Sequence, residues 1–209
     1  MTTSTTGQKD ERKFEDARKA ILERAALLIC EQGYEGTSMQ QIAVSCGLTK
    51  AGLYHYVESK EELLADIMTW GMDIFEEQVL KPVQDIEDPL LRLEECMRRN
   101  VLLCTRGWSR EITVILHEHQ TLRNATGRAI NARKKKYVAF LEESFREAMG
   151  RKLVRAEVDP TIAAFSFLGT VLWIYKWFRK DGRLTDEQVA DGMVDTFFNG
   201  IRPLQRSGR

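Results

Sequence analysis

The chain has 209 residues, of which 43% are hydrophobic and 30% are charged, and this balance excludes a disordered or fibrous protein. Its 31 basic and 31 acidic residues give no formal net charge, so affinity for an acidic partner has to come from a local patch. The four cysteines form no Cys-x-x-Cys pair, which favours reduced core residues over a disulfide or metal framework.

Residues 1–13 are Thr/Ser-rich and then charged, without the apolar run of a secretory signal, and we expect a disordered arm there. After them, residues typical of helix starts and ends are frequent, and strand signals are nearly absent. Capping boxes at 37–40, 59–62 and 185–188 and Asp-Pro pairs at 88–89 and 159–160 mark helix starts. An all-α fold follows, with predicted helices at residues 14–32, 38–45, 49–56, 60–80, 89–106, 109–120, 125–149, 160–179 and 186–201.

The first three predicted helices are short and closely spaced, whereas the later ones are long. This shift predicts two parts, a small N-terminal domain at residues 14–60 and a larger helical domain at residues 61–209. No flexible linker separates them, so one helix is expected to continue from the first part into the second.

A helix-turn-helix pattern occupies residues 38–57. Ala43, Gly47 and Leu53 have the spacing at which two short helices pack closely across a tight turn. Between Thr37 and Val57 the sequence holds no acidic residue, although the chain is otherwise rich in them. The combination predicts a DNA-binding segment.

In such a motif the start of the second helix enters the major groove. Lys50 can then donate to guanine, small residues let the backbone approach, and Thr37 and Ser38 begin a helix suited to a phosphate. The aromatic residues that follow are interpreted as phosphate clamps and packing residues. The candidate DNA-binding residues are Thr37, Ser38, Gln40, Thr49, Lys50, Ala51, Gly52, Tyr54, His55, Tyr56 and Lys60.

The segment "GYEGTSMQQIAVSCGLTKAGLYHYVESKEELL" closely resembles the DNA-binding domain of TetR-family repressors, with Val57 where that family usually has phenylalanine. The resemblance implies a cytoplasmic, homodimeric transcription factor, normally a repressor, that a small effector releases from a palindromic operator. Near the C-terminus, "VLWIYKWFRKDGRLTDEQVADGMVDTFFNGI" is similar to the branch that controls fatty-acid and steroid catabolism by sensing acyl-CoA thioesters.

Residues 161–178 are apolar around the whole helix, but Ser166, Gly169 and Lys176 interrupt them, which favours a buried helix over a membrane span. A partner subunit would cover what one chain cannot, through a four-helix bundle of segments 160–179 and 186–201 across a two-fold axis. An ordinary buried helix in a monomer is the alternative. The candidate dimer-interface residues are Phe167, Val171, Ile174, Phe178, Val194, Phe197 and Phe198.

An effector pocket is expected between helices of the second domain, with Arg133 and Tyr137 as the polar groups that fix the ligand. The candidate ligand-binding residues are Trp108, Ile112, Leu116, Arg133, Tyr137, Phe140, Trp173 and Trp177. Residues 123–136 hold six cations and no acid, and this stretch is a solvated face, an anion site or a second DNA contact. The anion site favours an amphipathic effector, a fatty acyl-CoA or another CoA thioester.

Three alternatives compete with this interpretation. The first is a TetR-like repressor that senses a neutral or cationic hydrophobic compound, as in efflux control. The second is a helical ligand carrier or an enzyme, although the sequence offers no Gly-rich phosphate loop, nucleophile elbow or paired-carboxylate spacing, so no enzyme and no cofactor are expected. The third is an architectural DNA-binding protein without an effector. His117 and His119 point apart on a helix, so no metal site is expected.

Overall fold

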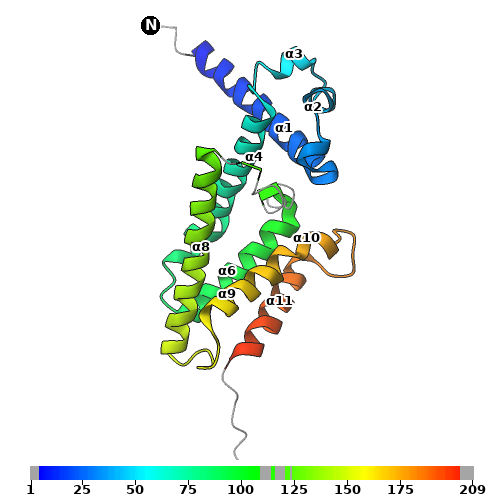
Figure 1. The fold of residues 1–209 in the computed structure, drawn as a ribbon. Coiled ribbons are helices and arrows are strands. Elements are labelled where there is room, and N and C mark those ends of the chain that lie inside the picture. The colour runs from blue at the N-terminus through cyan, green and yellow to red at the C-terminus, as the bar shows by residue number, and fades with distance from the viewer. Residues whose placement is uncertain (1–4, 109–113, 116–120, 123, 203–209) are drawn as a thin grey trace, which may run out of the picture. The chain divides into compact units, whose positions relative to one another are not determined.

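The computed structural model describes residues 5–108, 114–115, 121–122 and 124–202. These residues form helices and no strand, which confirms the all-α prediction (Figure 1). Within the same ranges, no helix has both the length and the apolar composition that crossing a bilayer requires.

The chain divides into two compact units. The first comprises Met1–Gly71 and Arg110–Ile130, and the second comprises Met72–Ser109 and Asn131–Arg209. The division therefore falls later than the predicted boundary at residue 60, because helix α4 (Lys60–Phe75) continues from one unit into the other.

The first unit begins with helix α1 (Thr5–Gly36), which is kinked at Gly33, where φ is 75°. The helix starts well before the predicted residue 14, so the expectation of a disordered arm over residues 1–13 is wrong from Thr5 onward. Residues 8–13 are exposed and carry no apolar stripe, so periodicity could not detect them. Their Gln, Lys, Glu and Arg side chains are nevertheless good helix formers.

Helix α2 (Met39–Ser45) starts with a capping box that lies one residue later than predicted. The Gln41 amide donates to Ser38 Oγ, and the Ser38 amide donates to Gln41 Oε1. Thr37, the predicted cap, is only 1% exposed, and its hydroxyl donates to the Gly33 carbonyl at 2.8 Å. Because that bond occupies Thr37, it fixes the turn between α1 and α2 and leaves capping to Ser38.

Helix α3 (Lys50–Leu53) is shorter than the predicted helix 49–56. The amides of His55 and Tyr56 bond to carbonyls three residues back, so the chain continues as a tight turn after Leu53. Gly47 turns the chain between α2 and α3 with a φ of 68°, which favours glycine. Ile42, Ala43 and Leu53 are fully buried, and their burial holds the two short helices together.

Arg18 joins α1 to α4 within the first unit. Its Nη2 donates to Asp66 Oδ2 at 2.6 Å, and its Nε donates to the Tyr56 carbonyl at 3.3 Å. Lys19 adds a cation–π contact, with Nζ 5.8 Å from the centre of the Trp70 ring. The helix-turn-helix segment is thus fastened at its end to the two long helices beside it.

The second unit contains the end of α4 and the elements that follow it. Two π-helical turns, η1 and η2, replace parts of the predicted helices 60–80 and 89–106, and most of the predicted helix 109–120 lies outside the described residues. The predicted helix 160–179 is interrupted at Trp173. The elements are η1 (Glu76–Leu80), α5 (Lys81–Gln84), α6 (Pro89–Leu103), η2 (Cys104–Trp108), α8 (Ala125–Gly150), α9 (Pro160–Leu172), α10 (Ile174–Trp177) and α11 (Asp186–Ile201).

The predicted helix starts in this unit are confirmed. Asp88 caps α6 by accepting from the Leu90 amide at 2.8 Å, and Asp159 caps α9 by accepting from the Ile162 amide at 2.9 Å. Thr185 closes a capping box at the start of α11. A proline follows each aspartate, at a position where no helix amide is needed.

The core of the second unit forms where α6, α8, α9 and α11 meet. Phe197 of α11 lies 5.9 Å from the Phe167 ring of α9 and 6.3 Å from the Phe145 ring of α8, measured between ring centroids. Each fully buried side chain of this kind contributes about 1.5–3 kcal/mol relative to an exposed position. The largest side chains without exposure are Leu93, Met97, Leu141, Phe145, Phe167 and Phe198.

A small polar cluster lies inside this apolar core. The Asn100 amide nitrogen donates to the Tyr137 hydroxyl at 2.9 Å, and that hydroxyl lies 3.3 Å from Cys96 Sγ. Burial raises the pKa of the Cys96 and Cys104 thiols to about 12, and burial also raises the pKa of Tyr137 well above its usual value. The cluster is therefore uncharged at neutral pH.

Tyr137→Phe should lower the free energy of unfolding by about 1–2 kcal/mol, because it removes the acceptor of the buried Asn100 amide. Denaturant titration followed by circular dichroism measures the change. Tyr54→Phe removes the same atom from a side chain that is 44% exposed, and it should have little effect. Equal stability of the two variants would mean that the buried cluster contributes nothing.

Candidate DNA-binding surface and effector unit

The start of α3 presents small and basic residues to solvent. Thr49 caps the helix by accepting from the Gly52 amide at 3.0 Å, and Lys50 and Ala51 are exposed. Gly52 is half-buried, and a Cβ there would lie 3.2 Å from Thr49 Oγ1. The cap and the following turn therefore require a small residue at position 52.

The aromatic residues after α3 have different environments. Tyr54 and His55 are exposed, whereas Tyr56 is half-buried and stacks on Phe14 of α1 with ring centroids 5.0 Å apart. Tyr54 and His55 are thus placed to meet an external partner, while Tyr56 mainly packs the motif against α1. Lys60 lies with Nζ 4.1 Å from the centre of the Tyr34 ring, a contact that holds its charge close to the motif.

The remaining candidates for DNA contact belong to the start of α2. Ser38 and Gln40 are exposed, so both are accessible to a partner. Thr37 is buried, and its hydroxyl is already bonded to Gly33. The Thr37 side chain therefore acts as a positioning residue for the turn, which corrects its assignment as a direct contact.

In the second unit, Arg133 is held by two carboxylates. Its Nη2 donates to Asp73 Oδ1 at 2.8 Å and its Nε donates to Glu76 Oε1 at 2.7 Å. An anion would have to displace both partners, so Arg133 is poorly suited to the anion site that the sequence suggested. The ion pairs instead fix α8 against the end of α4 and η1.

The other polar and apolar candidates on α8 face different surroundings. Tyr137 is 7% exposed and belongs to the buried polar cluster, and Phe140 is half-buried with its ring 6.4 Å from that of Tyr137. Lys134 is half-buried, and burial lowers its pKa to about 8. Lys135 and Lys136 are exposed, so the basic segment at residues 123–136 is a solvated face only in part.

The candidate effector-binding residues do not line one common pocket within the described part of the chain. Trp173 is 60% exposed and Trp177 is 47% exposed, so these rings face outward from a single chain. Ile112, Leu116 and the side chain of Trp108 lie outside the part of the chain that the structure describes. The sequence also missed Asn100, a polar residue inside the apolar stripe of α6, which its helical spacing from Leu93 and Met97 could have revealed.

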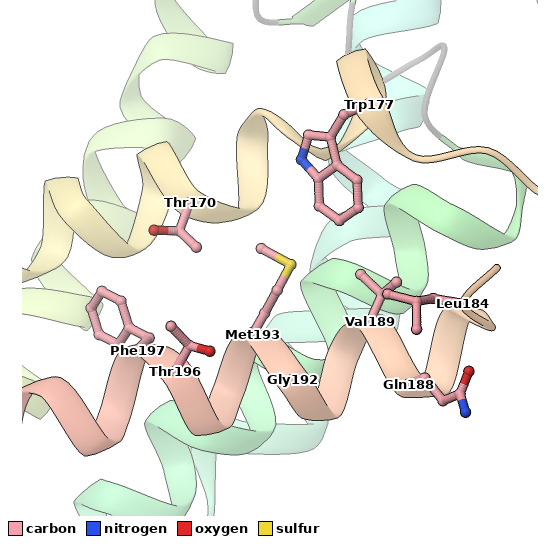
Figure 2. A pocket seen from close by; sticks show the side chains of 9 residues that line it. All are labelled: Thr170, Trp177, Leu184, Gln188, Val189, Gly192, Met193, Thr196 and Phe197. Carbon is pink, nitrogen blue, oxygen red and sulfur yellow. The ribbon is translucent and has the colours of Figure 1, made fainter. Parts of the chain in front are cut away.

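An apolar groove of about 590 Å³ lies between α11 and the pair α9–α10 (Figure 2). Figure 2 shows Met193 rising from α11 toward α9, with Trp177 of α10 at one side of the groove. The lining residues are Thr170, Trp177, Leu184, Gln188, Val189, Gly192, Met193, Thr196 and Phe197.

The dimer-interface candidates fall into two groups. Four of them (Phe167, Val171, Ile174 and Phe198) are fully buried inside one chain, so they build the subunit core and present no surface to a partner. Three are half-buried (Phe178, Val194 and Phe197), and Phe197 lines the groove. The apolar side chains that these helices expose are instead Ile162, Phe165, Trp173 and Trp177.

Comparison with known proteins decides the family. Residues 21–67 match the model of bacterial regulatory proteins of the tetR family, and residues 87–201 match the model of the tetracyclin repressor-like C-terminal domain. The chain belongs to the tetR family. It is a DNA-binding transcriptional regulator, and the predictions of family and of DNA binding are confirmed.

Among solved structures, the chain is 64% identical to AibR, in a crystal structure of AibR in complex with isovaleryl coenzyme A and operator DNA. That match has a TM-score of 0.81 and covers 87% of this chain and 98% of AibR. A structure of the ketosteroid transcriptional regulator KstR2 of Mycobacterium tuberculosis matches with a TM-score of 0.83 at 22% identity, over 90% of this chain and 95% of KstR2.

A curated relative gives the same assignment. The HTH-type transcriptional repressor KstR2 of Rhodococcus jostii is 25% identical over 193 residues, which are 88% of this chain and 90% of that repressor. Similarity to TetR-family regulators thus extends over both units. These relatives are transcriptional regulators.

Lys50→Ala should weaken operator binding of this TetR-family regulator by about tenfold and reduce the slope of log K against log salt by about 0.9. The reason is that Lys50 is an exposed cation at the start of α3, where no acidic residue competes. Fluorescence anisotropy with an operator fragment from around its own gene, at several salt concentrations, measures both quantities.

Lys81→Ala is the matched control, because Lys81 is an exposed lysine of the second unit that pairs with Glu77. It should leave operator affinity unchanged. If Lys50→Ala binds like Lys81→Ala, the assignment of α3 as the recognition helix is wrong. Lys136→Ala tests separately whether the basic segment touches DNA.

Proposed function

We propose that this regulator is a homodimeric repressor that binds a palindromic operator, and that a short branched acyl-CoA thioester lowers its affinity for that DNA. The observation that carries the proposal is the 64% identity to AibR over 98% of that protein, which was crystallised with isovaleryl coenzyme A and operator DNA. Identity at this level spans both the DNA-binding unit and the effector unit. The protein is expected in the cytoplasm, where bacterial operator DNA lies.

The similarity to AibR narrows the expected effector to a short branched acyl group, a chain length that the sequence alone does not specify. Each buried methylene contributes about 0.8 kcal/mol, so affinity rises with chain length while space remains. An enclosed site sized for a five-carbon branched acyl group overpacks once the chain is longer, at a cost of about 1–3 kcal/mol. Affinity is therefore expected to peak at isovaleryl-CoA and to fall for long fatty acyl-CoA.

The effector and the operator are expected to bind at separate sites. AibR was crystallised with both partners at once, so in that protein neither one excludes the other. For the present chain we infer a coupling between the sites of about 1–3 kcal/mol, which changes operator affinity about 5- to 150-fold. By reciprocity, the operator weakens effector binding by the same factor.

The groove between α11 and α9–α10 supports the second half of the proposal, dimerisation. A single chain leaves Phe165, Trp173 and Trp177 exposed, and Trp177 also lines a groove of about 590 Å³. A second copy related by a two-fold axis would bury this surface in a four-helix bundle. It would also supply the second recognition helix that a palindrome needs.

Gly192→Glu should produce monomers that bind the palindrome at least tenfold more weakly. Gly192 lines the groove, and a Cβ added at this position would meet no other atom within 4 Å. The change therefore adds a charge to the interface without disturbing the subunit. Analytical ultracentrifugation at micromolar concentration measures the oligomeric state.

The control is Gly200→Glu, since Gly200 is an exposed residue of the same helix, also has free space for a Cβ, and does not line the groove. It should remain dimeric. A Gly192→Glu protein that sediments as a dimer would show that the groove is not the interface.

Isovaleryl-CoA should release the regulator from operator DNA at micromolar concentration, whereas palmitoyl-CoA and free coenzyme A should do so at least tenfold less well. A titration of the preformed protein–operator complex, followed by anisotropy, measures this order. Isoamyl alcohol is the control for the acyl end alone.

Equal release by isoamyl alcohol, or release by cationic dyes and not by any thioester, would contradict the proposal. Those results would favour the alternative repressor that senses a neutral or cationic hydrophobic compound. No effect of any compound would favour a DNA-binding protein without an effector.

A further inference from the structure

A second, smaller pocket lies in the effector unit, on one face of α6 and η2. Arg99, Leu102, Leu103 and Arg106 follow one another at helical spacing, and Gln78 of η1 forms the opposite wall. The volume enclosed is about 190 Å³. The wall formed by η1 carries a π-helical turn, a rare backbone feature that occurs frequently at functional sites, and the other wall ends at a kink at Gly107, where φ is 132°.

The charged residues that line this pocket are both arginines. Arg99 and Arg106 are seven residues apart, about two helical turns, and none of the described lining residues is acidic. Leu102 and Leu103 add an apolar wall. A pocket with two guanidinium groups and an apolar side is suited to an amphipathic anion.

Arg99 has unused hydrogen-bonding capacity. Its Nη1 donates to the Gln78 carbonyl at 3.3 Å, which holds the side chain across the pocket. Its Nε forms an ion pair with Glu95 Oε1 at 2.8 Å, but this buried nitrogen is not aligned for a hydrogen bond with any described residue. A better-directed anionic acceptor can therefore compete with Glu95 for it.

Arg106 has its partners on another helix. Its Nε donates to Asp186 and its Nη2 donates to Glu187, both in the first turn of α11. The side chain is about half exposed, at 51%, so these ion pairs are accessible to a competing anion. Arg106 therefore connects the pocket to α11, the helix that forms one side of the apolar groove.

We propose that the pocket of Arg99 and Arg106 is the subsite for a phosphate group of the CoA effector. The inference rests on the proposed function, because it assigns the phosphate end of the same ligand. The two guanidinium groups bind the phosphate oxygens, and the Arg99 Nε gains a better-directed acceptor than Glu95. Arg133 is also held by two carboxylates, but its side chain is only 23% exposed, so it is less accessible to a phosphate than Arg106.

The contacts of Arg106 with α11 couple the proposed phosphate subsite to the proposed dimer interface. A phosphate bound to Arg106 competes with Asp186 and Glu187 for the same donors, and so loosens the tie between η2 and the first turn of α11. Because α11 also lines the groove, occupation of the subsite changes a helix on which the proposed dimer depends. The acidic residues thus oppose binding of the phosphate, and removing one of them should strengthen it.

Isothermal titration calorimetry on the full-length protein tests the subsite with two ligands, isovaleryl-CoA and the phosphate-free thioester isovaleryl-N-acetylcysteamine. Arg99→Gln and Arg106→Gln should each weaken isovaleryl-CoA binding about tenfold and leave the phosphate-free thioester unchanged. Glu187→Gln should strengthen isovaleryl-CoA binding a few-fold, an effect that damage to the fold does not produce. Raising the salt should weaken wild-type binding of the CoA ester more than that of either arginine variant.

Arg146→Gln is the matched control, since Arg146 is an exposed arginine of the same unit that pairs with Glu143 and lies outside the pocket. It should bind isovaleryl-CoA like the wild type. If Arg99→Gln and Arg106→Gln also bind it like the wild type, the subsite is overturned while the proposed function stands. If the wild type itself does not bind isovaleryl-CoA, the proposed function fails and this inference fails with it.

Discussion

Helix α6 packs against α11, α9 and η1, and its Arg92 side chain donates to Ser144 of α8, so the second unit is assembled around this one helix. Its inward face is buried along its length, with Leu93, Met97 and Val101 fully inside. A helix covered on so many sides can move only if several neighbours move with it. Any ligand that binds beside α6 therefore acts on the whole unit.

Polar residues on the same helix give this rigid element its specific contacts. Asn100 and Cys96 of α6 face inward to the Tyr137 hydroxyl, whereas Arg99 of α6 and Arg106 of the following η2 face the small pocket and reach η1 and α11. The inner contacts are neutral and fully buried, so they favour one arrangement of the core. Of the outer contacts, that of Arg99 with η1 is a hydrogen bond to the Gln78 carbonyl, and those of Arg106 with α11 are accessible ion pairs for which an anion can compete. The contacts that stabilise the core and those proposed to respond to an anion thus lie on different faces of α6 and η2.

The helix-turn-helix motif of the DNA-binding unit depends mainly on local interactions. Helix α3 has only four residues and is too short to be stable by itself. Its position depends on the Thr49 cap, on the positive φ of Gly47 and on the burial of Leu53 against α2. These are local features, which is why the sequence was sufficient to predict the helix-turn-helix motif. The same reason explains why the capped starts of α6, α9 and α11 were predicted correctly.

Features that depend on distant partners were not predictable in the same way. Residues 161–178 are apolar on all sides, so periodicity could not tell that Phe167 and Val171 lie in the core while Phe165 and Trp173 lie outside. Arg133 looked like a free cation because Asp73 and Glu76, its partners, are about sixty positions earlier in the chain. The shift from Thr37 to Ser38 at the start of α2 likewise follows from a bond to Gly33 that spacing alone does not reveal.

The high pKa of the buried thiols has a consequence for a protein that is proposed to bind thioesters. A thiolate attacks a thioester and takes over its acyl group, so a reactive cysteine near the effector would convert a reversible signal into a covalent modification. Because burial raises the pKa of Cys96 and Cys104 to about 12, both thiols stay protonated at neutral pH. Both cysteines are therefore unreactive toward a thioester. A thioester effector bound as proposed would therefore keep its acyl group beside these two residues, and occupancy would follow its concentration in the cell.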